Sequence, residues 1–336
     1  MKRILFISLL IVLQVSVIFA GGRYAGASLE LGIGARPLGL AGASAAMRGN
    51  GDVFYYNPAS LAFLARPTLN LMYAPSFGSL RSPLANYNYL GFAFPLPGGG
   101  TVALNWTRFT VDDIPLYPDL RGDSFSERYN DVTLRPDGVA LGTFRDLEDA
   151  FYFSFAKCAR KKVSLGWLFV DLPVETAFGM NVKMIRQRLY KSSASGIGID
   201  IGTMLRFNLG TLLNQRRLGD FSFGFSMTDI SQTAIIWDTK HEDRIHRTSL
   251  WGASYEQKLE FLNAKLKLFW THHHKYTREN LFGTEFVLKN LAVRLGKKKT
   301  GLTAGMGLRF WKLSVDYAFV VSAFENLNRI SCTIIL

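Results

Sequence analysis

The sequence predicts an all-β protein, a transmembrane antiparallel β-barrel of about 14 strands with a small N-terminal helical plug. Three observations support this prediction. The chain opens with the pattern of a secretion signal, and its C-terminal part alternates apolar and polar residues. Beyond the signal, no stretch approaches the roughly 20 apolar residues of a helical span. A closed barrel is the other structure that satisfies every backbone polar group in lipid.

Residues 1–20 have the three parts of a secretory signal peptide. Lys2 and Arg3 form the charged start, Ile4 to Leu13 is the apolar run, and Ala20 is a small residue at the expected cleavage site. A membrane-anchoring helix is the alternative, but it needs a run of roughly 20 apolar residues. We therefore expect cleavage during export and a location in the outer membrane of a bacterium with two membranes.

The composition agrees with a barrel. The chain has 31 Gly, 26 Phe and 13 Tyr, which suit tightly turned strands with aromatic girdles, and 19% charged residues. Lys and Arg outnumber Asp and Glu by 39 to 26. The secretion signal argues against nucleic acid as a partner, so outer-membrane lipid and lipopolysaccharide are expected instead. Cys158 and Cys332 lie in strand-like runs, where a disulfide or two small apolar fillers would fit the pattern.

About fourteen candidate strands follow residue 67, each near the length of a tilted membrane strand. We divide the chain into a signal peptide (1–20), an N-terminal plug segment (21–67) and an outer-membrane β-barrel (68–336). The strands are expected at 68–74, 87–94, 101–111, 151–158, 174–190, 196–207, 220–228, 247–258, 262–272, 281–289, 291–296, 301–310, 312–320 and 328–336.

Side chains alternate along several of these segments, which separates a lipid face from a lumen face. In the last strand Ile330, Cys332 and Ile334 share one face, whereas Arg329 and Ser331 lie on the other. A charge that faces lipid at mid-membrane costs about 2 to 4 kcal/mol, so the polar side chains are expected inside. The candidate lumen-facing residues are Asn105, Asn181, Lys183, Asp200, Lys265, Lys267 and Asp316.

The connections alternate in length, as in barrels that have long outer loops and short inner turns. The expected outer connections are 75–86, 112–150, 191–195, 229–246, 273–280, 296–300 and 321–327, and the inner ones include 95–100, 259–261, 290 and 311. Two of the expected inner connections, 159–173 and 208–219, are longer than the short inner turns that this pattern requires. Residues 163–170 are an alternative further strand. The acidic loop 112–150 is expected to be mobile or to bind a partner.

The segment before the barrel does not alternate. Residues 38–47 are rich in small residues and are expected to form a short, closely packed helix. Asn57 and Pro58 predict the start of a second helix, with Asn57 as N-cap and Pro58 at the first helical position. A compact segment of this kind has no place in the barrel wall, so we expect it inside the lumen. The motif residues are Gly34, Arg36, Gly39, Gly42, Asn57 and Pro58.

Both ends of the chain resemble the PorV/PorQ family of outer-membrane proteins, which belongs to the wider FadL-like group of barrels. Residues 34–43 (GARPLGLAGA) and 52–62 (DVFYYNPASLA) are similar to the family's N-terminal signature, G-A-R-A-L-G-M-G-G-A followed by Y-W-N-P-A-G-L-A. Residues 301–309 and 313–318 resemble its closing strands. The departures from this signature include Pro37, Ala41, Tyr56 and Ser60.

The resemblance implies a non-enzymatic function at the outer membrane. It points to an accessory or cargo-holding component of protein secretion of the type IX kind, whose partners would be secretion-system proteins or secreted cargo. The alternative is FadL-like passive transport of a hydrophobic small molecule. A cargo holder needs exposed loops that grip protein, whereas a transporter needs an apolar pocket.

Catalytic and metal chemistry have weak support in the sequence. His272, His273 and His274 are adjacent, and neighbouring side chains on a strand point to opposite faces, so at most two of them can share a metal. His241 and His246 lie in an expected loop with several acidic residues but without a hydrolase motif. We therefore expect no cofactor, no metal and no catalytic residues.

Overall fold

The computed structural model describes residues 25–49, 51–79, 82–134, 138–166, 170–215, 217–321 and 326–336. The expected signal peptide, residues 1–20, lies outside them. Within the described residues, no helix has both the length and the apolar character to cross a membrane.

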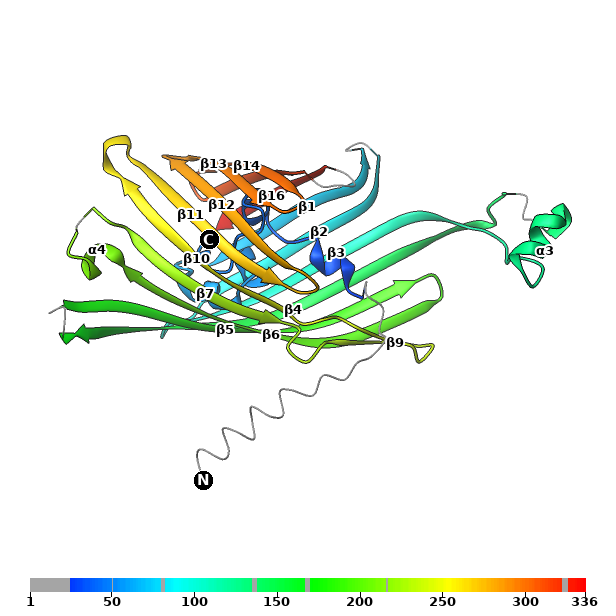
Figure 1. Cartoon of the computed structure of the whole chain (residues 1–336), viewed down its shortest axis with the longest axis horizontal. Coiled ribbons are helices and arrows are strands. Elements are labelled where there is room, and N and C mark those ends of the chain that lie inside the picture. The colour runs from blue at the N-terminus through cyan, green and yellow to red at the C-terminus, as the bar shows by residue number, and fades with distance from the viewer. Residues whose placement is uncertain are drawn as a thin grey trace, which may run out of the picture.

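Fourteen antiparallel strands close into a ring, which confirms the predicted barrel and its strand number. Neighbours in the chain are neighbours in the ring, β1 pairs with β16, and β5 pairs with β6 (Figure 1). The barrel strands are β1 (Thr68–Ser79), β2 (Ser82–Pro95), β3 (Gly100–Leu116), β4 (Gly142–Leu165), β5 (Val170–Leu189), β6 (Ser192–Asn208), β7 (Asp220–Thr228), β10 (Thr248–Leu259), β11 (Ala264–His274), β12 (Arg278–Leu288), β13 (Leu291–Lys298), β14 (Gly301–Phe310), β15 (Leu313–Val320) and β16 (Leu327–Ile335).

Two strands outside the ring form a short hairpin in the connection between β7 and β10. They are β8 (Ala234–Trp237) and β9 (Glu242–Arg244), and β8 pairs with the end of β6. This connection and the one between β3 and β4 lie at the same end of the barrel, on the right in Figure 1. Because bacterial barrels carry their longer loops outside, we refer to this end as the outer end and to the opposite one as the inner end.

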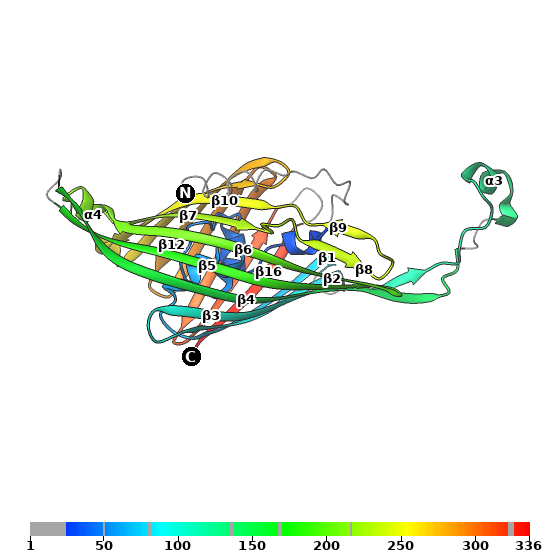
Figure 2. The same ribbon diagram turned by 90° about the horizontal axis from the view of Figure 1, so that it is seen from below.

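The strands β1 to β6 are longer than the sequence predicted. β1 and β2 pair out to Ser79 and Ser82, so the expected outer connection 75–86 was wrong. β3 and β4 continue into the expected loop 112–150 and carry α3 (Phe125–Asn130) and η4 (Val132–Leu134) at their tip, forming an arm that projects from the barrel (Figure 2). At the inner end, β4 pairs with β5 out to Leu165 and Val170, so the expected connection 159–173 and the alternative strand 163–170 were wrong. The alternation of apolar and polar side chains did not predict these extensions, because they lie beyond the apolar band of the barrel.

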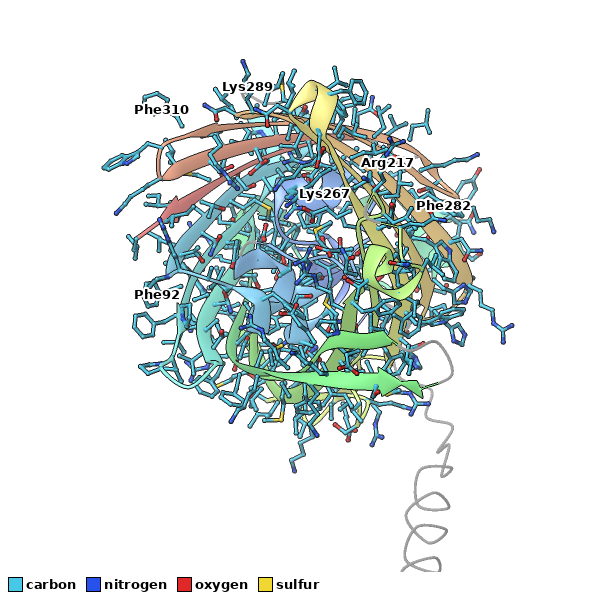
Figure 3. All side chains as sticks on the ribbon, turned by 90° about the vertical axis from the view of Figure 1, so that its left-hand side faces the viewer. Phe92, Arg217, Lys267, Phe282, Lys289 and Phe310 are labelled. Carbon is cyan, nitrogen blue, oxygen red and sulfur yellow. The ribbon has the colours of Figure 1, made fainter. Side chains whose placement is uncertain are left out.

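The predicted facing of the strands is confirmed where alternation was clear. In β16, Arg329 and Ser331 are buried, whereas Ile330 is 47% exposed on the outside. Figure 3 looks along the barrel from its inner end and shows Phe92, Phe282 and Phe310 pointing away from the wall, with Lys267 pointing inward. The exterior is therefore apolar and the lumen polar, which is the architecture of an outer-membrane barrel.

The remaining helices are short. η1 (Ala27–Glu30), α2 (Ala35–Gly39), η2 (Gly51–Tyr55) and η3 (Pro58–Phe63) belong to the segment before β1, while α4 (Leu209–Leu212) and η6 (Glu260–Leu262) cover inner turns. Figure 3 shows the segment before β1 within the ring of strands. Cys158 and Cys332 are not joined by a disulfide.

Candidate functional site

Residues 25–67, which we call the N-terminal segment, run from the outer end of the lumen to the inner end. At the outer end, Lys275 beyond β11 forms an ion pair with Glu30 in η1. At the inner end, the carbonyl of Pro67 accepts a hydrogen bond of 3.0 Å from the backbone N–H of Leu336. The chain thus threads the lumen before it forms the wall.

The position predicted for the first helix of this segment was wrong. The helix is α2, residues 35–39, and not 38–47. Pro37 fits into the first turn, where no backbone N–H is needed. The helix ends because Ala41 and Gly42 have positive φ angles of 57° and 78°, a conformation that glycine adopts without strain. Ala41 stands where the PorV/PorQ signature has glycine.

Arg36 anchors α2 to the barrel wall through Glu285 of β12. Its Nε and Nη2 donate to the two carboxylate oxygens of Glu285 at 2.9 and 2.8 Å. The same carboxylate accepts from Arg294 at 2.8 Å and lies 3.1 Å from Lys267. Arg294 in turn lies 2.7 Å from Asp316. This cluster, which we call the Glu285 layer, is mostly buried and lies between α2 and the strands β11, β12, β13 and β15.

The second predicted helix begins where expected. Asn57 is the N-cap of η3, and its side-chain oxygen accepts a hydrogen bond of 3.0 Å from the N–H of Ala59. Its Nδ2 donates to the carbonyl of Ala45 at 2.7 Å. Pro58 occupies the first helical position, and the helix is of the 3-10 type. Asn57 therefore both starts η3 and joins it to the preceding turn.

Glycines of the wall let the N-terminal segment lie directly on the strands. A methyl group on Gly179 of β5 would overlap the backbone of Pro58, and one on Gly224 of β7 would overlap the carbonyl of Ala45. Gly39 approaches Gly305 of β14 in the same way. The segment is seated against the wall by close backbone contact, and bulkier residues at these points would push it out.

Asp52 in η2 is a buried acid without a full set of partners. Its side chain is almost inaccessible, and its Oδ1 has no hydrogen-bond partner. Burial raises the pKa of Asp52 to about 7, although the nearby Arg36 opposes this shift. Burial therefore favours the protonated form of this carboxyl.

A cavity of about 330 Å³ lies above the N-terminal segment, in the outer half of the lumen. Much of its lining is apolar, from both the segment and the wall, and includes Leu29, Leu31, Leu38, Tyr55, Ile245, Leu250, Leu281 and Val320. Charged side chains from the outer ends of several strands complete it. A concave, mostly apolar site with a few placed polar groups is the usual form of a small-molecule pocket.

Two of the cavity's cations are neutralised within the protein. Lys183 donates to Asp200 at 3.0 Å and to Asp229 at 2.8 Å. Lys275 pairs with Glu30. These two groups fix the cavity walls and the entry of the N-terminal segment, and their own cations are not available to a ligand.

Arg329 of β16 differs from these cations because no carboxylate pairs with it among the described residues. Its side chain lines the cavity and is 1% exposed. Its Nη1 donates to Ser76 Oγ at 3.0 Å and to the carbonyl of Pro75 at 3.2 Å, while its Nη2 has no partner. A buried guanidinium with a free donor and no counter-charge is suited to an anion.

The other predicted lumen-facing residues serve different parts of the interior. Asn181 donates to the carbonyl of Phe54 at 3.2 Å, which ties β5 to η2. Asn105 accepts from the hydroxyl of Tyr89 at 2.9 Å. Lys267 and Asp316 belong to the Glu285 layer, and Lys265 lies near the inner end, half-exposed and 3.9 Å from Glu256.

Four charged residues of the interior were not predicted as site residues. They are Glu285, Arg294, Arg329 and Asp52. Alternation places Glu285 and Arg294 on the lumen face, opposite the apolar Phe286 and Val293, and this signal was available. No sequence pattern indicates that Arg329 lacks an acidic partner. The three adjacent histidines lie at the end of β11, and no group of three metal-binding side chains occurs in the part of the chain that the structure describes.

Comparisons with known proteins give distant structural similarities. A scan against protein-family models and a search of curated proteins found no match. Among solved structures, the chain is similar to the toluene transporter TodX of Pseudomonas putida, with 11% identity, a TM-score of 0.45, and coverage of 91% of this chain and 99% of TodX. CdiB from Acinetobacter baumannii shares 11% identity at a TM-score of 0.35, covering 81% of this chain and 60% of CdiB.

Proposed function

We propose that this protein is a non-enzymatic outer-membrane transporter that binds small, mainly apolar molecules with an acidic group and passes them inward. The observation that carries this proposal is Arg329, a buried arginine in a mostly apolar cavity, which has no acidic partner among the described residues. The apolar lining favours the hydrocarbon part of the ligand, and the guanidinium favours its anionic group.

The position of the cavity supports entry from the outside. It lies in the outer half of the lumen and is bordered below by α2 and the turn that follows it. The Glu285 layer lies beside α2, where Arg36 joins the N-terminal segment to the wall. Passage therefore requires the N-terminal segment to shift, and a molecule that enters is held first at the cavity.

A matched pair of probes tests this proposal. In lipid nanodiscs, 1-naphthoate is expected to bind the protein about tenfold more tightly than 1-methylnaphthalene, because a charged hydrogen bond contributes about 1.5 to 3 kcal/mol. The substitution Arg329→Gln should abolish this preference. Isothermal titration calorimetry against empty nanodiscs measures both affinities.

The control is Lys265→Gln, which removes a lumen-facing cation near the inner end, outside the cavity. It should leave the preference for naphthoate unchanged. If the parent protein binds the two probes equally, or if Arg329→Gln retains the preference in a heat-modifiable, folded barrel, the proposed ligand recognition is wrong.

A second candidate function is the holding of secreted protein cargo at the outer face, as the PorV/PorQ resemblance implies. The arm favours it, because several large apolar side chains are exposed at its tip. Phe125 is 78% exposed and Tyr129 is 67% exposed, and their rings stack with centroids 6.2 Å apart. Exposed apolar clusters of this kind are typical of protein contacts.

Deletion of the arm separates the two candidates. In the native host, replacing residues 118–140 by a short Gly-Ser linker should release surface-held proteins into the medium if the protein holds cargo. Arg329→Gln should have no such effect. An unchanged set of surface proteins after the arm deletion would exclude cargo holding by the arm and leave the transport proposal intact.

A further inference from the structure

The outside of the wall is hollowed over β1–β6, away from the lumen cavity. One exterior hollow of about 570 Å³ lies among apolar side chains of the lipid-facing surface. Its lining includes Leu90, Leu104, Phe151, Phe153, Val182 and Ile197. An apolar depression on the lipid face is a place where acyl chains pack closely against protein.

A second exterior hollow of about 610 Å³ continues the first toward the outer end. The strand register shows that the two are adjacent. Along β5, Met184 lines the apolar hollow, and the next residue on the same face, Arg186, lines the polar one. On β6, Ile197 is paired with Met184, and Ser195 is paired with Arg186. The outer face therefore changes from apolar to polar at the same level on both strands.

Two arginines of the polar hollow have no partner among the residues that the structure describes. Arg186 and Arg188 are exposed on the lipid-facing side of β5, and neither forms an ion pair or hydrogen bond with the described residues. They lie two residues apart, so their Cα atoms are separated by roughly 7 Å along one strand face.

Arg108 completes the cationic edge but is neutralised. Its guanidinium pairs with both oxygens of Asp149 at 2.8 and 2.9 Å, and it lies over the ring of Trp106 at 4.8 Å. The indole N–H of Trp106 also donates to Asp149 at 2.7 Å. This arrangement is rigid, and it leaves Arg186 and Arg188 as the groups available to an anion.

We propose that the two hollows form one binding site for a phosphorylated glycolipid of the outer leaflet. The acyl chains occupy the apolar hollow, and a phosphate is bound by Arg186 and Arg188. Two features favour this occupant. The arginines are complementary in charge to a phosphate, and both lie where the apolar surface ends at the outer end of the barrel. An exposed arginine there costs only about 0 to 1 kcal/mol, and phosphate is its preferred bidentate partner.

The polar lining favours a sugar headgroup over a simple phospholipid. Ser193 and Ser195 line the hollow beside the arginines, and Asp238 accepts hydrogen bonds from the backbone N–H and the hydroxyl of Ser193. Hydroxyl and carboxylate groups are suited to the hydroxyls of a sugar. The hollow is also larger than a single phosphate needs.

Lipid retention tests the proposal. The purified protein in detergent is incubated with lipid A, with phosphatidylglycerol or with inorganic phosphate, and bound lipid is counted by native mass spectrometry. The parent should retain lipid A in preference to phosphatidylglycerol. The double variant Arg186→Gln/Arg188→Gln should bind lipid A about tenfold less tightly, since it loses charged hydrogen bonds.

The control variant is Lys161→Gln/Lys162→Gln, which removes the same charge from exposed positions at the inner end of β4. It should bind lipid A like the parent. The variant Arg186→Lys/Arg188→Lys keeps the charge without the bidentate geometry and should bind with intermediate affinity.

Three results would overturn the proposal. The first is equal lipid A affinity in the parent and the folded Arg-to-Gln variant. The second is phosphatidylglycerol binding as tight as lipid A binding, which would remove the role of the sugar. The third is displacement of lipid A by inorganic phosphate at equal concentration, which would leave an anion site without a lipid requirement.

Discussion

At the scale of single residues, the interior is organised around charges that have partners and a few that do not. Glu285 neutralises Arg36 and lies against two further cations, whereas Asp52 has an oxygen without a partner. An acid buried in this way is most compatible with the fold when it carries its proton. The pH dependence of stability should therefore contain a contribution from Asp52.

The substitution Asp52→Asn should stabilise the protein at pH 8. Because the pKa of Asp52 rises from 3.8 to about 7 on folding, the folded state holds a proton that the unfolded state releases. The contribution to stability therefore falls as the pH rises from about 4 to about 7. The neutral amide of asparagine does not titrate and does not lose this stability. The variant should therefore melt a few degrees above the parent at pH 8 and at the same temperature as the parent at pH 4.

Thermal melting in detergent at several pH values measures this difference. Asp119→Asn, which removes an exposed carboxylate on the arm, should show no such pH dependence. A variant at Asp52 that melts below the parent at pH 8 would contradict a buried, protonated acid.

At the scale of elements, the wall and the N-terminal segment fit each other through glycines. Gly179 and Gly202 are paired across β5 and β6. The N-cap residue Asn57 and the following Pro58 lie against them. The short helix η3 is thus positioned both by its cap and by the smooth strip of wall that it contacts.

Replacing Gly179 by alanine should displace η3. The new methyl group would overlap the backbone of Pro58. That backbone is part of η3, so the overlap can be relieved only if η3 moves. Overpacking of this kind costs about 1 to 3 kcal/mol. The expected result is a lower urea midpoint and faster proteolysis of the N-terminal segment.

Gly142→Ala is the matched control. It changes a strand glycine that has nothing within 4 Å of the added carbon, so the urea midpoint should be unchanged. Equal midpoints for Gly179→Ala and Gly142→Ala would show that η3 is not held against β5.

At the scale of the whole molecule, the lumen contains an outer cavity and, beside α2, the buried charges of the Glu285 layer. The N-terminal segment supplies Arg36 to that layer, and four wall strands supply the other charges. If this layer closes the barrel, loosening it should open a path for water and ions.

The substitution Glu285→Gln should raise conductance in planar bilayers. It removes the carboxylate that holds Arg36, and an unneutralised buried cation costs about 3 to 5 kcal/mol. The N-terminal segment should therefore leave its position more often, giving more frequent channel openings. Glu260→Gln, at an exposed inner turn, should be as closed as the parent. A folded Glu285→Gln barrel that stays closed would show that this layer is not the barrier.

The sequence by itself determined the barrel and its strand number, because alternation along each strand reports directly which face meets lipid. It also placed the N-cap at Asn57, which depends on neighbours in the chain. The bounds predicted for α2 were wrong, because Ala41 and Gly42 adopt left-handed conformations. Neither the periodicity of the sequence nor its content of small residues predicts these conformations. The ends of β3, β4 and β5 were misjudged because alternation is lost where both faces meet water.

Only the tertiary structure decided which charges meet. Arg36 and Glu285 are 249 residues apart in the chain, and their bidentate pair depends on the segment being folded back through the ring. Within the described part of the chain, Arg329 has no acidic partner, and the two exterior hollows meet at Arg186. Both features follow from the register of neighbouring strands. Local sequence sets the face of each side chain, whereas closure of the ring sets its neighbours.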